Sequence, residues 1–179
     1  VRQVRMKYID TSRKNKETVR WAFLIEPEQM LADRLDMIAI KNDNVSIIQT
    51  DAYHTNIMSM FQMIIGNSDY SVAGRHNIKL LKDKDPLNLS VIPVPYDFDY
   101  TGLVDTYYAI PSEYTGLKSV RERMYLGPCR DDKSYLAATE HLDQCMDEIL
   151  STIKDFQYLN QKYKDEMIDY ILEYYAISD

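Results

Sequence analysis

The chain has 179 residues and a mass of 21.0 kDa, with 45% hydrophobic and 27% charged residues, a composition typical of one globular domain. Apolar residues are too many, and glycine and proline too few, for a collagen-like, low-complexity or disordered chain. There is no run of about 18 apolar residues, so we expect no transmembrane segment. The net charge of −7 argues against nucleic acid as a partner, because a polyanion would be repelled.

The start of the chain predicts a two-stranded antiparallel hairpin. Residues 1–10 alternate imperfectly and are rich in Val, Ile and Tyr, which is typical of a strand. Residues 11–18 form a polar connection, and residues 19–26 form a short apolar run, ended by Pro27, that predicts a buried strand. Residues 1–20 carry seven basic and two acidic side chains. We expect a solvated basic face there, with a phosphate-contacting surface as the alternative.

Two helices are predicted in the next part of the chain. A first helix starts at Pro27, a residue favoured at the first helical position, and runs to about Leu35. Thr50 or Asp51 caps a second helix, which ends at Gly66. The apolar residues of this second helix, which recur at three- and four-residue spacing, are Ile57, Met60, Phe61, Ile64 and Ile65.

The second half of the chain predicts another hairpin and two more helices. Short strands are expected at 78–82 and 89–98, and the two prolines in the latter favour an edge or a strand end. Residues 100–135 are predicted to be irregular, and an irregular stretch of that length is usually functional. Two amphipathic helices follow, marked by Leu142, Cys145, Met146, Ile149, Ile153 and Phe156 and by Tyr163, Met167, Ile168, Ile171, Leu172 and Tyr175. The order of hairpins and helices indicates an α+β fold.

Short polar residues near the ends of the second hairpin are candidates for a metal site. Asp69, Asn77 and Asp97 carry oxygen atoms of the kind that Mg²⁺ prefers, and Asp99 is a further carboxylate. The 28 residues from Asp69 to Asp97 contain one predicted hairpin, so both ends of that hairpin would lie side by side. The alternative also stays open: Asn67-x-Asp69 is a common turn signature, and the later aspartates would then only cap the next segment.

Two runs carry a resemblance to known proteins, MFQMIIGNSDYSVAGRHNIKLL at 60–81 and IPVPYDFDYTGLV at 92–104. They resemble the catalytic core of the CotH spore-coat kinases, atypical bacterial kinases with an Asn-x-Asp…Asn loop, a short hairpin and a Trp-Asp-x-Asp metal motif. The segment Tyr96-Asp97-Phe98-Asp99 looks like that metal motif with Tyr in place of Trp. The chain is also similar, over most of residues 1–130, to a bacterial family with the hallmarks IGN(T/S)D, HN and PYDFD(Y/W)(S/T)GLV.

The resemblance implies an Mg²⁺-dependent phosphotransferase that moves a phosphoryl group from ATP to an unknown protein or small-molecule acceptor. Asp69 would be the catalytic residue that faces the acceptor hydroxyl, and Asn77, Asp97 and Asp99 would hold the metal. Residues 27–179 would form the large lobe of a protein-kinase-like fold. Such chemistry needs positioning and charge neutralisation more than covalent help from the protein.

The same resemblance makes residues 1–26 the end of a truncated small lobe, with Ile25 and Glu26 as the nucleotide-binding hinge. The chain departs from the kinase pattern in three places. Its catalytic loop is longer than usual, and it has neither a glycine-rich phosphate loop nor the strand lysine paired with a helix glutamate. We therefore expect the first strands of the small lobe to lie before Val1 and this chain alone to be inactive. The alternative function is a non-catalytic kinase-like binding or cell-surface module.

The remaining reactive side chains give weaker signals. His54, His76 and His141 have no metal-ligand spacing. His76 lies in the candidate loop, where a hydrogen bond to backbone is favoured over a contact with phosphate, and His141 shares one helix face with Cys145. Cys129 and Cys145 do not form a disulfide framework and leave the compartment undetermined, with an exported bacterial protein that has a further N-terminal segment as one expectation.

Overall fold

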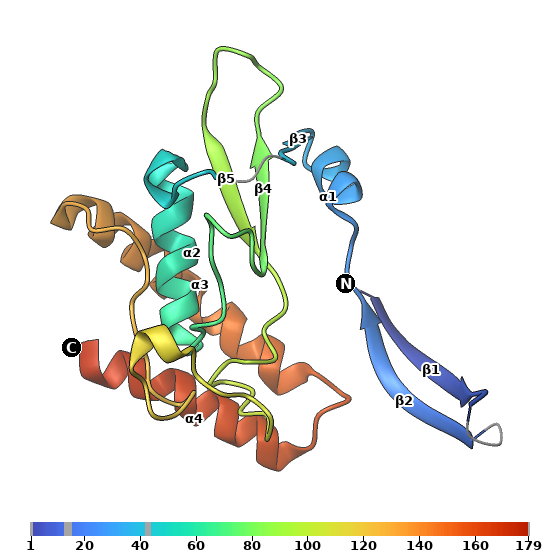
Figure 1. The fold of residues 1–179 in the computed structure, drawn as a ribbon. Helices are drawn as coiled ribbons and strands as arrows, with labels where there is room; N and C mark the ends of the chain where they lie inside the picture. Colours follow the sequence, from blue (N-terminus) through green and yellow to red (C-terminus); the bar gives the residue numbers. More distant parts are fainter. Residues whose placement is uncertain (1, 13–15, 42–43, 179) are drawn as a thin grey trace.

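The computed structural model describes residues 2–12, 16–41 and 44–178. Within these residues the chain forms four α-helices and two small antiparallel sheets, which confirms the predicted α+β class. No helix in these ranges is long and apolar enough to cross a membrane. Figure 1 shows one hairpin set apart from a helical body, from which the hairpin of the second sheet projects at one end.

The helices and strands are labelled in chain order in Figure 1. They are β1 (Arg2–Asp10), β2 (Lys16–Leu24), α1 (Glu28–Arg34), β3 (Ile38–Ala39), α2 (Ala52–Ile64), β4 (Ile78–Lys82), β5 (Val91–Pro95), α3 (Asp132–Asp155) and α4 (Gln161–Ser178). Short 3₁₀ turns occupy Ile47–Gln49 and Glu113–Thr115.

The first hairpin forms as predicted, with Arg2 of β1 opposite Leu24 of β2. Its second strand begins at Lys16, earlier than expected, because the polar residues at its start continue the antiparallel ladder. Residues 13–15 of the predicted connection lie outside the described residues.

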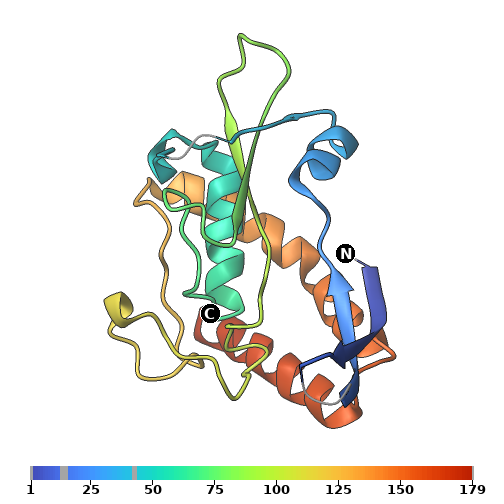
Figure 2. The ribbon, with the colours of Figure 1, turned by 45° about the vertical axis from the view of Figure 1, so that its right-hand side comes forward.

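The prediction that residues 19–26 form a buried strand is wrong. Trp21 is 59% exposed and Phe23 is 56% exposed. Burial of a strand needs a second layer, and the described residues cover this two-stranded sheet only at isolated points. One such point is the ring of Trp21, whose centroid lies 5.4 Å from that of Tyr158, in the connection between α3 and α4 that Figure 2 shows behind the hairpin.

Local signals set the limits of α1 and α2 as predicted. Pro27 precedes α1, which ends at Arg34. Asp51 is the N-cap of α2, because its side chain accepts a hydrogen bond from the backbone N–H of His54 at 2.9 Å. Gly66 follows α2 with a φ of +65°, a left-handed conformation that glycine adopts readily at the end of a helix.

Both sides of α2 are buried, and one of them is polar. Its apolar side joins a core cluster that includes Ile64 with Leu142 of α3 and Ile171 of α4. The other side carries four fully buried polar side chains: Thr55, Asn56, Ser59 and Gln62. The irregular segment after β5 covers it closely, since a Cβ added to Gly127 would lie 2.6 Å from Ser59 Cβ. The apolar periodicity of α2 does not reveal this second contact.

The second sheet has the order β3-β4-β5, and its two faces pack on different helices. Leu80 of β4 faces a cluster with Met58 of α2, and the neighbouring Leu81 faces a cluster with Leu31 of α1. β4 has the predicted limits, whereas β5 is shorter than predicted because Asp97 takes a positive φ of +60° just beyond it. This hairpin therefore holds the segment that carries Asp97 against the body.

The third helix starts earlier than its apolar pattern suggests. Residues 100–131 are irregular apart from the 3₁₀ turn, but α3 begins at Asp132, ten residues before Leu142. Asp131 caps it by accepting the backbone N–H of Ser134 at 3.0 Å. The apolar pattern from Leu142 onward did not include these first turns, although Ala138 is buried in them.

Candidate functional site

The hairpin of β4 and β5 brings two of the candidate segments together. Ile78 pairs with Pro95, and the backbone N–H of Tyr96 donates to the carbonyl of Asn77 at 3.0 Å. Asn77 is therefore next to the residue that precedes Asp97, although 20 residues separate Asn77 from Asp97 in the sequence. The two ends of the predicted hairpin do lie side by side at this point.

Asp69 sits in a compact network with His76 and Asn77. Its Oδ1 lies 2.8 Å from His76 Nε2, and its Oδ2 accepts a hydrogen bond from Asn77 Nδ2 at 3.0 Å. Asn77 Nδ2 also donates to the backbone carbonyl of Asp69 at 2.9 Å. Both carboxylate oxygens of Asp69 are thus held, and His76 contacts a carboxylate here rather than backbone through its ring.

Asn67 has a structural role in this loop. Its Oδ1 accepts the backbone N–H of Asp69 at 2.8 Å, and its Nδ2 donates to Gln62 Oε1 at 3.0 Å. Asn67 is buried. The turn interpretation of the Asn-x-Asp signature therefore describes Asn67 well, and the turn it makes presents Asp69 at the surface of the loop.

Asp97 and Asp99 form an acidic pair. Burial and the negative charges of Asp99 and Asp69 raise the pKa of Asp97 above its usual range, while the charge of His76 lowers it. Asp99 Oδ2 accepts a hydrogen bond from the hydroxyl of Tyr108 at 2.9 Å. Asp97 is therefore less readily ionised than a free carboxyl, and a nearby cation would offset the repulsion that Asp97 receives from Asp99 and Asp69.

Two of these residues have a strained backbone. Asn77 has a φ of +54° and Asp97 a φ of +60°, at the two ends of the same hairpin. A left-handed conformation costs an L residue roughly 1 kcal/mol, somewhat less for Asn and Asp. Strain of this kind tends to gather where function fixes the side-chain direction.

An apolar pocket of about 400 Å³ lies beside the acidic pair. From β2 and the residue after it come Phe23 and Ile25, and from the chain after β5 come Tyr96, Asp97 and Asp99. Its remaining lining residues are Pro95, Phe98 and Val104. The volume is within the roughly 300–1,000 Å³ usual for small-molecule sites. The wall of the pocket is almost entirely apolar, although Asp97 and Asp99 are among the residues that line it.

The two predicted hinge residues differ in their placement. Ile25 lines the pocket, whereas the Glu26 side chain turns to α1 and makes two hydrogen bonds with Arg34 at 3.0 and 2.9 Å. The backbone carbonyl of Glu26 accepts a hydrogen bond from Lys79 Nζ, and that ammonium also lies 5.0 Å from the ring centroid of Tyr96. Lys79, which the sequence did not single out, therefore ties the hinge segment to the segment that carries Asp97.

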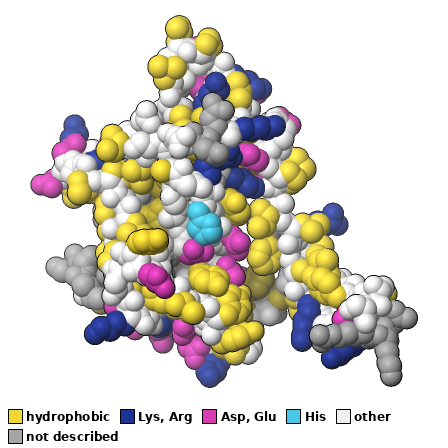
Figure 3. Space-filling model, viewed as in Figure 1, with side chains coloured by type: hydrophobic (Ala, Val, Ile, Leu, Met, Phe, Trp, Pro, Cys, Tyr) yellow, Lys and Arg dark blue, Asp and Glu magenta, His cyan; other side chains and the backbone are white. Residues whose placement is uncertain are grey.

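Asp97, Asp99 and Asn77 carry the oxygen atoms of a candidate site for a hard cation. Asp97 and Asp99 supply carboxylate oxygens, and no donor among the described residues reaches Asn77 Oδ1. Within the described ranges no group of three His, Cys, Asp or Glu side chains has metal-binding geometry. Mg²⁺ commonly takes one or two protein carboxylates and completes its shell with water and phosphate oxygens. Figure 3 shows a histidine next to acidic side chains near the middle of this face, above a broad hydrophobic area.

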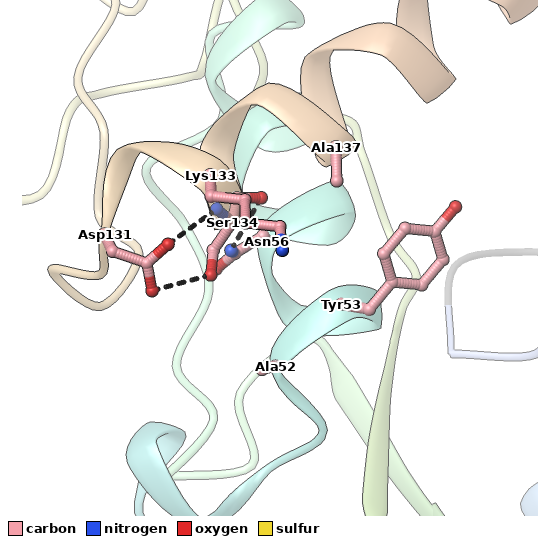
Figure 4. A pocket seen from close by; sticks show the side chains of 7 residues that line it. All are labelled: Ala52, Tyr53, Asn56, Asp131, Lys133, Ser134 and Ala137. Carbon is pink, nitrogen blue, oxygen red and sulfur yellow. Dashed lines mark hydrogen bonds between the residues drawn. The ribbon is translucent and has the colours of Figure 1, made fainter.

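A second pocket, of about 410 Å³, lies where α2 and α3 begin, and Figure 4 shows its lining. Buried Asn56 donates to the carbonyl of Ser134 at 3.3 Å, and Lys133 and Tyr53 lie at the edge. None of the predicted site residues lines this pocket. We therefore do not assign it to the candidate site.

The other reactive side chains stay outside the candidate site. His54 Nδ1 lies 2.7 Å from the capping carboxylate of Asp51. Half-buried Cys145 has its sulfur 3.9 Å from His141 Nε2 on the same helix, as expected from their spacing. Both Cys129 and Cys145 are free thiols.

Searches with protein-family models, curated proteins and solved structures found no match to the chain. Any assignment of function therefore depends on the geometry of the residues described above.

Proposed function

We propose that the protein is an Mg²⁺-dependent phosphotransferase of kinase-like fold, which binds ATP and phosphorylates a hydroxyl of a protein or small molecule. The observation that carries the proposal is the pocket that joins Ile25 to Asp97 and Asp99. The apolar wall of the pocket suits a nucleobase, and the carboxylates of Asp97 and Asp99 beside it would suit a cation with phosphates. These residues come from segments more than 70 positions apart, so their meeting is a property of the tertiary fold.

In this proposal the acidic pair holds the metal. Asp97 and Asp99 would ligate Mg²⁺ together with the free Oδ1 of Asn77. The bound ion would neutralise phosphate charge, the main requirement of phosphoryl transfer. The raised pKa of Asp97 supports this role, because a carboxylate with unfavourable neighbours gains more from a cation than a carboxylate already paired.

Asp69 would face the acceptor. Its hydrogen bonds with His76 and Asn77 fix the orientation of the carboxylate, and such orientation is what a catalytic-loop aspartate needs to position a hydroxyl. Asn77 would then link the two halves of the site, since its amide nitrogen holds Asp69 and its amide oxygen is left for the metal.

The test is a calorimetric titration of Mg-ATP into the full-length protein, the Asp97→Asn variant and an Asp147→Asn control. Asp147 is an exposed residue of α3, so the control makes the same change of charge away from the pocket. We expect metal-dependent binding in the wild type and the control and its loss in Asp97→Asn. Equal binding of ATP in all three proteins, or binding that does not depend on Mg²⁺, would refute the proposal.

The second candidate is a kinase-like binding module without turnover. It is favoured by the network around Asp69, in which both carboxylate oxygens already have partners within the chain. Such a module would bind the nucleotide but transfer no phosphate to water or to any acceptor. Measurement of ADP release alongside the titration separates the two candidates.

A further inference from the structure

Tyr170 of α4 touches both of the loops that carry the candidate site. It is 1% exposed. A Cβ added to Gly66 would lie 2.1 Å from the Tyr170 hydroxyl oxygen, and a Cβ added to Gly102 would lie 2.4 Å from it. Gly66 begins the loop that leads to Asp69, and Gly102 follows Asp99 by three residues. Only glycine leaves room for this hydroxyl at both positions.

The two loops are also joined to each other at this point. The backbone N–H of Gly102 donates to the carbonyl of Gly66 at 3.0 Å, and that of Leu103 donates to Ile65 at 3.0 Å. These two bonds bring the chain before Asp69 against the chain after Asp99. The hydroxyl of Tyr170 is thus packed at the seam where the two loops meet.

Two arginines complete the assembly around the tyrosine ring. The guanidinium carbons of Arg121 and Arg123 lie 4.2 and 3.7 Å from the ring centroid of Tyr170. Arg121 donates to the carbonyl of Gly102 at 3.1 Å, and Arg123 donates to that of Ile64 at 3.1 Å. The Tyr170 hydroxyl in turn donates to the carbonyl of Arg121 at 3.2 Å. Arg121 therefore connects the ring to the loop after Asp99, and Arg123 connects it to the end of α2, just before the loop of Asp69.

We propose that Tyr170 is a positioning residue, which sets the loop of Asp69 relative to the loop of Asp97 and Asp99. Its meaning for catalysis rests on the proposed function, because only a phosphotransferase needs these two loops in register. The structural coupling between the two loops does not rest on the proposed function, because it concerns only how one loop responds to a change in the other. The close-packed contact leaves little freedom for either loop to move alone.

The test is a substitution in one loop with a measurement in the other. Gly66→Ala should speed amide hydrogen exchange in the other loop, at residues 97–103, by about tenfold, because the amides of Gly102 and Leu103 donate to carbonyls beside the overpacked contact. Gly116→Ala is the matched control, because Gly116 has a φ of +70° but nothing within 4 Å of an added Cβ. Exchange in β4 serves as the reference for global stability.

A second variant makes the role of the hydroxyl explicit. Tyr170→Phe removes the oxygen that lies 2.1 Å from the added Cβ of Gly66→Ala and leaves the ring carbon and the backbone oxygen of Val120 both at 3.2 Å, so it should restore slow exchange at 97–103. It should not rescue Gly102→Ala, whose Cβ also lies 2.4 Å from the backbone oxygen of Val120. Mg-ATP affinity, where the wild type binds it, should follow the same pattern of loss and rescue.

The possible results separate the two proposals. Faster exchange at 97–103 in Gly66→Ala, with rescue by Tyr170→Phe, supports the coupling. If the wild type binds no Mg-ATP, that finding refutes the proposed function but leaves the coupling supported. Exchange that changes near Gly66 alone, or equally in β4, or without rescue, overturns the coupling. Normal Mg-ATP affinity in a Gly66→Ala protein with loosened 97–103 shows that the register does not matter for binding and overturns the positioning role.

Discussion

The same substitution, Asp to Asn, should have opposite effects on stability at Asp97 and Asp51. The pKa of Asp97 is raised by burial and by the charges of Asp99 and Asp69, so the folded state disfavours its ionised form. The pKa of Asp51 is lowered: burial raises it, but hydrogen bonds from His54 and Ser90 outweigh that effect. One carboxylate is therefore destabilising at neutral pH and the other stabilising.

The magnitudes follow from the contacts. Asp97→Asn removes repulsion that is largely screened by solvent, so we expect a gain of about 0.5 kcal/mol in the free energy of unfolding. Asp51→Asn keeps an N-cap acceptor but loses the charge that faces His54 Nδ1 at 2.7 Å and Ser90 Oγ at 3.0 Å, at a cost of about 1 kcal/mol. In a chain of this length, 1 kcal/mol corresponds to roughly 2–4 °C in Tm.

The assay is urea denaturation followed by circular dichroism, at pH 7 and at pH 3. The penalty of a raised carboxyl pKa is absent below the unfolded value of about 3.9 and grows as pH rises through the folded pKa. The gain in Asp97→Asn should therefore be present at pH 7 and absent at pH 3. The contribution of Asp51 should fade as pH falls through its lowered pKa. Addition of Mg-ATP at pH 7 should make the wild type more stable than Asp97→Asn, because the wild type and Asp51→Asn keep the proposed metal site and Asp97→Asn does not. A loss of stability in Asp97→Asn at pH 7 would refute the reasoning and favour a capping role.

Three further predictions concern the site and its support. Asp69→Asn should leave Mg-ATP affinity within about twofold and slow phosphoryl transfer by about 100-fold, because its role is toward the acceptor; a steady-state ADP assay and calorimetry together check this. Lys79→Met should speed proteolysis after β2, because it removes the ammonium that joins the carbonyl of Glu26 to the ring of Tyr96, whereas Lys82→Met at the other end of β4 should not. Leu142→Ala should cost about 3 kcal/mol in urea denaturation, since this residue is 5% exposed in the main cluster of helices, and a cost below about 1 kcal/mol would contradict that packing.

Elements with local signals were predictable from the sequence. The limits of α2 follow from the cap at Asp51 and the glycine at Gly66, and both act within one turn of the helix. The limits of β4 follow from a short apolar run between polar turns. The closeness of Asn77 and Tyr96 was predictable as well, because a hairpin brings its own two ends together.

Features that depend on distant segments were not predictable in the same way. Periodicity showed the apolar side of α2 but not the burial of Ser59, which depends on the irregular segment around Gly127, far along the chain. The apolar run of β2 gave no sign that Trp21 would be exposed, because exposure depends on what covers the strand. The meeting of Ile25 with Asp97 was implied by the kinase resemblance alone and by no spacing in the sequence.

The contact of Tyr170 with Gly66 has a consequence for biosynthesis. The two residues are 104 positions apart, and a ribosome adds roughly 5–20 residues per second. The loop that carries Asp69 is therefore made about 5–20 s before the tyrosine that packs against it. During that interval the helix before the loop can form, but the contact between the two loops lacks the packing that Tyr170 of α4 provides. Chains that terminate before α4 would keep every predicted site residue and still lack the packing that holds those residues in place.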